Sequence, residues 1–197
     1  MPTNYGQLKT QVADFLQRSD LTSFIPTFIA DATARFSDEL RTPEMETVAS
    51  TTITGEWTAL PVDFRAMRLI EAGGKVLEYL TPWQVQRQIE QAYVPLKPSY
   101  TIQDMQFRVY PFPTSTAVEV TYYAALEDFS TDASSNWLLN KRPDIYRMAA
   151  IAQARLFLHD DPRVLMAMQV VDKFIAEQNR SARQIAIGGA PLAVTPG

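Results

Sequence analysis

The residues best suited to chemistry stand together in the C-terminal third of the chain, in the stretch HDDP at positions 159–162. His159 is the only histidine, and Asp160 and Asp161 follow it directly. An imidazole beside carboxylates can act as a general base, so one hypothesis is a small hydrolase that uses His159 with Asp160 or Asp161. Such a pair also needs a nucleophile within hydrogen-bond reach, and adjacent residues seldom direct both side chains to one point.

The same stretch fits a corner between two helices. Asp161 before Pro162 is an N-cap followed by a proline at the first helical position, which is a common helix start. His159 then lies in the last turn of the preceding helix, where an imidazole suits the negative end of the helix dipole. In this interpretation Asp161 and His159 have structural roles and Asp160 is solvated. We therefore assign no catalytic residue.

Two other stretches contain residues that could bind a metal or a phosphate. Four acids surround the end of a predicted helix: Asp38, Glu39, Glu44 and Glu46. Paired carboxylates can bind metal or carry acid–base catalysis, but a run of this kind is typical of a solvated helix face. Residues 72–75, AGGK, lack the longer glycine spacing and the Lys-Ser/Thr ending of a phosphate-binding loop. One histidine and no cysteine make a poor supply of zinc ligands, so the sequence predicts no metal and no cofactor.

Composition and charge narrow the classes of protein that the chain can belong to. Of its 197 residues, 46 % are hydrophobic and 20 % are charged, which suffices for an ordinary globular core. The net charge is −4 and the basic residues are scattered singly, which disfavours a third hypothesis, a nucleic-acid-binding module. No apolar run reaches the roughly 18 residues of a membrane span, and the N-terminus lacks the pattern of a signal peptide. We expect a soluble protein made in a cytoplasm, without membrane contact.

Helical spacing marks both ends of the chain, over residues 4–42 and 143–180. In the first range, two apolar stripes are separated by the polar break RSDLTS at 18–23, which predicts an antiparallel pair with an N-cap in the break. The apolar stripe that each helix would bury is Tyr5, Leu8, Val12 and Phe15 in the first, and Ile25, Ile29, Ala32, Phe36 and Leu40 in the second. The second range contains an alanine-rich helix over 145–158 that is apolar on nearly all sides. Such a helix is buried in a core or between subunits. A final amphipathic helix follows, with one apolar stripe formed by Val164, Met168, Val171 and Ile175.

Between these ranges, from 47 to 123, apolar residues alternate with a period of two, which predicts strands. TVASTTIT and EWTAL flank Gly55 and predict one hairpin, and MRLIE and KVLEY flank the glycine pair at 73–74 and predict another. Thr81 before Pro82 predicts the start of a short inserted helix. The fold class is therefore α+β: an antiparallel bundle of two N-terminal and two C-terminal helices, with a small antiparallel β-sheet region inserted.

The stretch from 184 to 197 differs in composition from the rest of the chain. It contains no charge and five glycines or prolines. Because an uncharged apolar segment exposed to water is a liability, we expect it to dock on a partner, for example by adding a strand to an open sheet edge. The alternative is a frayed tail. We accordingly divide the chain into a single domain, 1–184, and an extended C-terminal arm, 185–197.

Six short motifs carry a resemblance to a known family. In chain order they are YGQLKTQVADFLQRSD at 5–20, FIADATARFSDELRTPEME at 28–46, LPVDF at 60–64, YTIQDMQFRVYPFP at 100–113, VTYYAAL at 120–126 and NWLLNKRPDIYRMAAIAQARLFLHDDPRV at 136–164. Their order resembles that of the head-to-tail adaptor (connector) proteins of tailed bacteriophages, over nearly the whole chain to about Arg183. One turn departs from the pattern, since Gln103 and Asp104 stand where glycine is expected.

The resemblance implies a structural virion protein without enzymatic activity. Its subunits would form a homo-oligomeric, twelve-fold ring that binds the portal protein on one side and tail or nozzle proteins on the other. The ring would stand at the portal vertex of a virion that is assembled in the host cytoplasm. Genomic DNA would pass through its channel without sequence-specific binding, and a net negative charge suits a channel in which DNA must not stick.

The resemblance also implies a role for the arm, because in such adaptors a C-terminal segment reaches the portal. The portal-docking residues would be the apolar residues of the arm: Ile185, Ile187, Pro191, Leu192 and Val194. The alternative within the same class is a neck stopper or tail-completion protein, which would bind the tail side instead.

Overall fold

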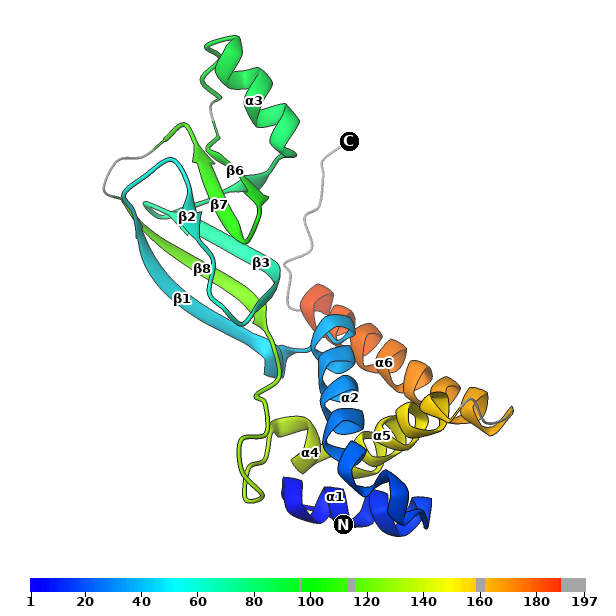
Figure 1. Ribbon diagram of the computed structural model, residues 1–197. Coiled ribbons are helices and arrows are strands. Elements are labelled where there is room, and N and C mark those ends of the chain that lie inside the picture. Colours follow the sequence, from blue (N-terminus) through cyan, green and yellow to red (C-terminus); the bar gives the residue numbers. More distant parts are fainter. Residues whose placement is uncertain (96, 113–115, 159–161, 189–197) are drawn as a thin grey trace, which may run out of the picture. The chain divides into compact units, whose positions relative to one another are not determined.

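The computed structural model describes most of the chain, namely residues 1–95, 97–112, 116–158 and 162–188. The protein contains both helices and strands, as the sequence predicts, and it divides into two compact units (Figure 1). One unit is made of Met1–Glu44 with Ala125–Gly197, and its described elements are helices. The other unit, Met45–Ala124, contains the strands and includes the β-rich stretch expected at 47–123.

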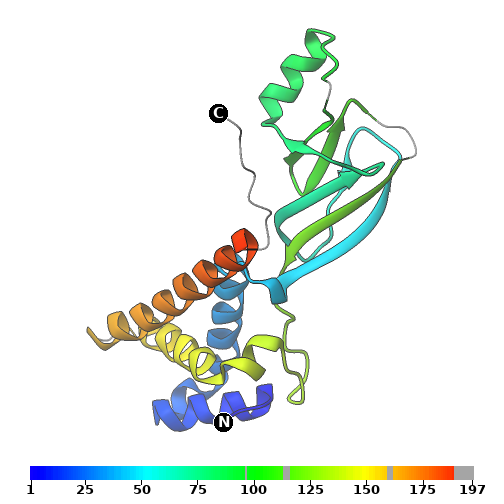
Figure 2. The same cartoon turned by 180° about the vertical axis from the view of Figure 1, so that it is seen from behind.

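The helical unit is built around one central helix. Its α-helices within the described residues are α1 (Tyr5–Leu16), α2 (Ile25–Glu39), α4 (Trp137–Lys141), α5 (Pro143–Phe157) and α6 (Pro162–Gly188). Helix α5 contacts α1, α2, α4 and α6, and it lies between α1 and α6 in the views from both sides (Figures 1 and 2). Because α5 is apolar on nearly all sides, it can contact several helices at once.

Buried aromatic and aliphatic side chains hold α2 against α5. The rings of Phe36 and Tyr146 meet edge to face with centroids 5.4 Å apart, and neither side chain is exposed. Small residues of α5, including Ala150 and Ala154, are fully buried and let neighbouring backbones approach. The predicted stripe of the second helix is confirmed as core, since each of its residues is at most 2 % exposed: Ile25, Ile29, Ala32, Phe36 and Leu40.

The polar break between the first two helices differs from the prediction. It forms a 3-10 helix, Ser19–Phe24, and α2 then begins at Ile25 without a side-chain cap. The expected N-cap is therefore wrong. The cause is Leu21, which is 3 % exposed: the break turns inward to bury this side chain, and the helical turn leads directly into α2, whose first turn contains Pro26.

The β unit contains two four-stranded sheets rather than the single small antiparallel sheet that was expected. One sheet has the strand order β1-β8-β3-β4 and the other β2-β7-β6-β5. The elements of this unit are β1 (Glu46–Ile53), β2 (Thr58–Ala59), β3 (Phe64–Ala72), β4 (Lys75–Val76), β5 (Glu78–Tyr79), α3 (Pro82–Glu90), β6 (Ser99–Gln103), β7 (Gln106–Tyr110) and β8 (Thr116–Ala124). Strand β5 pairs with β6 in parallel, and the other pairs are antiparallel.

The predicted hairpin around Gly55 is wrong. Strand β1 pairs with β8 over its whole length, from Glu46 opposite Tyr123 to Ile53 opposite Thr116, and the two-residue β2 pairs with β7. An eight-residue strand gains far more backbone hydrogen bonds from the long β8 than it could gain from β2. The hairpin at the glycine pair 73–74 is confirmed, because β3 pairs with β4 across that turn.

Alternation in β8 places its apolar side chains in the core of the β unit. Val118, Val120 and Tyr122 are each at most 3 % exposed and pack with Ile70 and Phe107, as the period of two predicts. Burial, together with the hydrogen bond from the Tyr122 hydroxyl to a neighbouring carboxylate, raises the pKa of this tyrosine to about 12.

The helix start at Thr81 is confirmed, whereas the turn between β6 and β7 is unusual. The Thr81 hydroxyl and the Gln84 side chain form a capping box at the start of α3. In the turn, Gln103 lies opposite Gln106, and both Asp104 and Met105 have positive φ angles, of 49° and 56°. The two strands are therefore joined by a two-residue hairpin turn, although the turn lacks the expected glycine.

Candidate interaction surfaces

An apolar groove opens on the surface of the helical unit, between α1, α5 and α6. It has a volume of about 250 Å³, and its apolar lining includes Phe15, Met148, Ile151, Met166 and Val170. The groove is open to solvent, because Phe15 is 55 % exposed, Met166 70 % and Val170 44 %. Apolar side chains gathered in this way are typical of a contact with another protein. We call this surface the α5 groove.

Two arginines of helix α5 flank the apolar side chains of the groove. The Arg147 guanidinium donates a hydrogen bond to Oε1 of Gln11 at 3.2 Å, and that of Arg155 lies 5.8 Å from the centroid of the Phe15 ring. Within the described part of the chain, neither arginine forms a salt bridge with a carboxylate. Among the described residues, the groove thus combines apolar surface with positive charge that no carboxylate pairs with, which suits a partner bearing acids and small apolar side chains.

The amino-acid pattern explains why α6 brings apolar side chains to the surface. Its predicted stripe is largely confirmed as core, with Val171 and Ile175 at most 5 % exposed. A second apolar set, Leu165, Met166 and Val170, lies beside that stripe and is exposed. Sequence reasoning missed the groove because it used only the first stripe and assigned Phe15 to the buried side of α1. The second set in α6 was the signal that could have revealed it.

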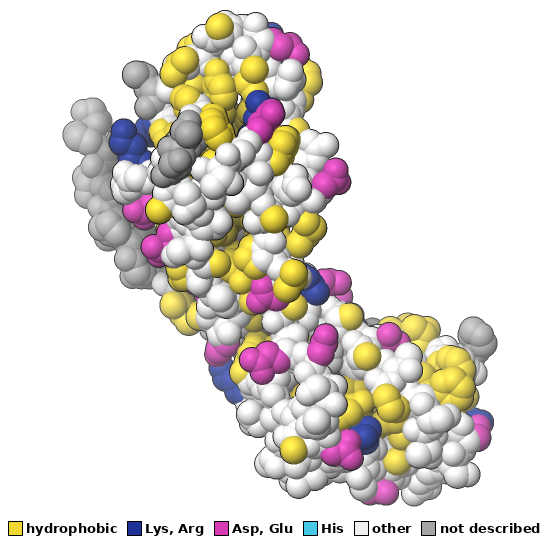
Figure 3. All heavy atoms as spheres, turned by 60° about the vertical axis from the view of Figure 1, so that its left-hand side comes forward, with side chains coloured by type: hydrophobic (Ala, Val, Ile, Leu, Met, Phe, Trp, Pro, Cys, Tyr) yellow, Lys and Arg dark blue, Asp and Glu magenta, His cyan; other side chains and the backbone are white. Residues whose placement is uncertain are grey.

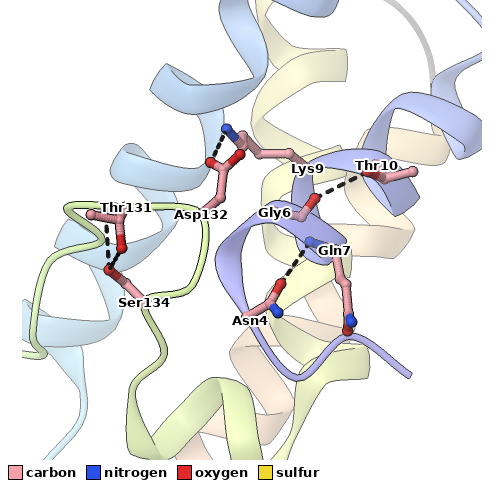
Figure 4. A network of polar contacts seen from close by, with 8 residues as sticks. All are labelled: Asn4, Gly6, Gln7, Lys9, Thr10, Thr131, Asp132 and Ser134. Atoms are coloured by element: carbon pink, nitrogen blue, oxygen red, sulfur yellow. Dashed lines mark hydrogen bonds and ion pairs between the residues drawn. The ribbon is translucent and has the colours of Figure 1, made fainter.

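A polar network fastens the segment 128–135 to the start of α1 (Figure 4). The amide of Gln7 donates to Oδ1 of the N-cap Asn4 at 2.9 Å, and the amide of Gly6 donates to the carbonyl oxygen of Asp132 at 2.9 Å. The Lys9 ammonium pairs with the Asp132 carboxylate at 2.7 Å. This network borders a shallow polar depression of about 580 Å³.

The contacts of this network are structural: they attach the segment 128–135 to helix α1. The hydrogen bond to Asp132 raises the pKa of Lys9, which favours the charged form of this ammonium group. The Tyr5 ring stacks on Phe129 with centroids 4.8 Å apart, and burial raises the pKa of its hydroxyl. The network therefore fixes the position of α1, the helix that brings Phe15 to the α5 groove.

The four acids noted in the sequence are dispersed in the structure. Glu39 pairs with Arg35 at 2.8 Å within α2, and Glu44 pairs with Lys141 at 2.5 Å, which lowers the pKa of that glutamate. Glu46 belongs to the β unit and forms its own pair there. Over the described ranges, no three His, Asp or Glu side chains gather in an arrangement that could hold a metal ion.

The stretch HDDP falls mostly outside the described residues. Helix α5 ends at Phe157 and α6 begins at Pro162, while His159, Asp160 and Asp161 lie in the segment between them that the structure does not describe. The corner and the hydrolase hypotheses for these three residues both stay predictions.

The C-terminal arm stays a prediction, and helix α6 extends into its first residues. Helix α6 continues to Gly188, so Ile185 and Ile187 belong to a helix rather than to an extended segment, and Ile185 is 64 % exposed. The sequence from 184 to 187 contains neither glycine nor proline, so nothing in it ends the helix before the Gly-Gly pair at 188–189. Pro191, Leu192 and Val194 lie outside the described residues.

The β unit also presents apolar side chains to solvent. Figure 3 shows hydrophobic side chains at the surface of both units, with acidic and basic side chains scattered between them. On and near α3, Trp83 is 64 % exposed and Tyr93 55 %, and the Arg87 guanidinium lies 4.8 Å from the centroid of the Trp83 ring. Strand β1 is an edge strand, and its residues 47–53 carry no charge. An uncharged edge of this length can accept a strand from a partner.

In the part of the chain that the structure describes, no helix combines the length and the apolar character that crossing a bilayer requires. The exposed apolar features of the described residues are the α5 groove, the exposed end of α6, and the apolar side chains and open edge of the β unit. These features agree with a protein that works by assembling with others.

Comparison with known proteins identifies the family. The model of the SU10 adaptor protein family matches residues 3–195, which is nearly the whole chain. No curated protein matches significantly. A family match of this length agrees with the resemblance carried by the six sequence motifs, and the chain belongs to the SU10 adaptor protein family, a family of phage structural adaptors.

Proposed function

We propose that the protein forms a homo-oligomeric, twelve-fold ring that connects the portal of a phage capsid to the tail. The observation that carries this proposal is the family match over residues 3–195. The α5 groove supports it, because a surface of this kind is costly to leave in water. Copies of the chain would bind the portal protein on one side of the ring and tail or nozzle proteins on the other, at the portal vertex of the virion.

In this ring, genomic DNA passes through a central channel that continues the channel of the portal. The net charge of −4 and the scattered basic residues support passage without tight or sequence-specific binding, since neutralising phosphates would hold the DNA in place. The function requires protein–protein contacts and no catalysis.

The C-terminal arm docks on the portal in this proposal. Its apolar residues are Ile185, Ile187, Pro191, Leu192 and Val194, and the chain from 184 onward carries no charge. The continuation of α6 to Gly188 refines the arrangement: Ile185 and Ile187 extend the reach of a helix, and the residues after 188 supply the docking segment. Multiple arms on one ring would strengthen attachment together, because each bound arm raises the effective concentration of the next.

Binding to isolated components tests the proposal. The purified chain is mixed with portal rings, and separately with tail components, and the complexes are separated by size with their mass measured by light scattering. We expect a stoichiometric complex with the portal rings. Binding to tail components alone would contradict the adaptor function and favour a neck stopper or tail-completion protein.

A further inference from the structure

The exposed apolar side chains of the α5 groove can be covered by another protein surface, and the helical unit itself carries a surface of complementary character. This second surface is the side of α2 that faces solvent, formed by Thr27, Ala30, Asp31, Ala34 and Asp38, all of which are exposed. We call it the α2 outer face. It combines small side chains, which let another helix approach closely, with two aspartates.

The two surfaces lie on opposite sides of the helical unit. Successive residues of an α-helix are rotated by about 100°. On α5, Arg155 of the groove is therefore about 180° around the helix from Tyr146, whose ring packs against Phe36 of α2. On α2, Thr27 is about 180° from Phe36, and Ala34 about 160°. The outer face of α2 and the groove thus point away from each other, with the contact between α2 and α5 in between.

The charges of the two surfaces are complementary in sign and in spacing. Arg147 and Arg155 stand eight residues apart on α5, a rise of about 12 Å along the helix axis. Asp31 and Asp38 stand seven residues apart on α2, a rise of about 10.5 Å. Asp31 has no basic partner among the described residues, so this aspartate can meet an arginine of the groove across an interface.

We propose that the α5 groove of one copy receives the α2 outer face of the next copy. The small side chains of Ala30 and Ala34 leave room for Phe15, Met166 and Val170 to pack against α2, while the aspartates approach the arginines. Because the contact joins two different surfaces on opposite sides of the unit, it is head-to-tail, and contacts of this kind generate a ring when the rotation between neighbours closes. This inference rests on the proposed function and names the interface through which the ring forms.

Cysteine cross-linking tests the interface, since the chain has no cysteine of its own. The double variant Val170→Cys with Ala34→Cys places one thiol in the groove and one on the outer face, both at exposed positions. After treatment with a short bismaleimide, with portal rings present and also at high protein concentration without them, we expect a ladder of species larger than dimers. Each single variant should give no ladder, because two copies of the same surface do not meet.

A matched control keeps the groove thiol and moves the other one. The variant Val170→Cys with Ser130→Cys places its second thiol at an exposed position of the segment 128–135, and we expect no ladder from it. A portal complex that forms without a ladder from the first pair, or equal ladders from both pairs, overturns the interface. Absent portal binding by the wild-type chain contradicts the proposed function instead, and the ladder without portal then still decides the interface.

Charge exchange gives a second, independent measurement. Arg155→Glu and Asp31→Arg should each raise the protein concentration needed for assembly by about tenfold, because each juxtaposes like charges. The two changes together should restore most of the loss, since every groove then offers an acid to an arginine of the next copy. Additive losses in the double variant would show that the two residues do not face each other.

Discussion

Tyr146 joins three segments of the helical unit through one hydroxyl group. Its side chain is fully buried on α5, its hydroxyl is hydrogen-bonded to Oγ1 of Thr33 on α2, and it accepts from Nδ2 of Asn136 at 3.3 Å. Because the Thr33 hydroxyl donates to the carbonyl of Ile29 at 2.9 Å, the tyrosine must be the donor to Thr33. Burial raises the pKa of Tyr146 to about 12.

Removing this hydroxyl should weaken the helical unit. We expect Tyr146→Phe to lower the free energy of unfolding by about 1–2 kcal/mol, because the buried Thr33 and Asn136 each lose a partner while the ring packing stays. Urea unfolding at neutral pH measures the change. Tyr93→Phe, at a position that is 55 % exposed, is the matched control and should change stability very little. Equal effects of the two substitutions would contradict the role of the buried network.

The raised pKa of Tyr146 also predicts a loss of stability in alkali. The unfolded chain ionises this tyrosine near pH 10, whereas the folded chain does so near pH 12. Its contribution is therefore complete below pH 10 and is lost as the pH rises toward 12. Between these values, Tyr146→Phe should lose about 2 kcal/mol less stability than the wild-type chain. Parallel stability curves for the two proteins over this range would refute the prediction.

At the scale of elements, short sequence patterns correctly predicted the features that depend only on residues close together in the chain. The core stripe of α2 and the cap at Thr81 follow from helical spacing and from capping chemistry, and the structure confirms both. The partner of β1 could not be found in this way, because it depends on β8, which is about seventy residues away in the chain. The α5 groove was missed for a related reason: the sequence shows that Phe15 is apolar but not whether a neighbouring helix covers it.

The turn between β6 and β7 gives a prediction at this scale. Asp104 and Met105 both have positive φ angles, which side chains with a Cβ atom disfavour. We expect Met105→Gly to stabilise the β unit by about 1 kcal/mol, measured by thermal unfolding. Gly74→Ala in the other two-residue turn, where φ is +73°, should destabilise it by a similar amount. A destabilised Met105→Gly variant would show that this methionine contributes contacts that outweigh its backbone strain.

At the scale of the whole molecule, both units present apolar surface. The helical unit carries the α5 groove and the exposed end of α6, and the β unit carries its own exposed apolar side chains and an open strand edge. Composition and motif order were enough to indicate the family. Each of the six motifs is weak by itself, but their order over most of the chain is specific. They could not place the start of the arm, which depends on how far α6 continues past Arg183.

Truncation of the arm tests its proposed role. Deleting residues 189–197 leaves α6 complete, so we expect the melting temperature to stay nearly unchanged. Affinity for portal rings should fall by at least about tenfold, equivalent to about 1.4 kcal/mol of binding free energy, because the apolar docking segment is lost. Calorimetry and binding titrations measure the two quantities. Unchanged affinity of a folded truncated protein would remove the docking role from the arm.

The most direct test of the central claim is an electron-microscopy image of the complex formed between this chain and purified portal rings. We expect a second ring of twelve copies, stacked on the portal with its opening aligned to the portal channel, and C-terminal segments that run toward the portal. Single copies bound without a ring, or no density added to the portal at all, would contradict the account.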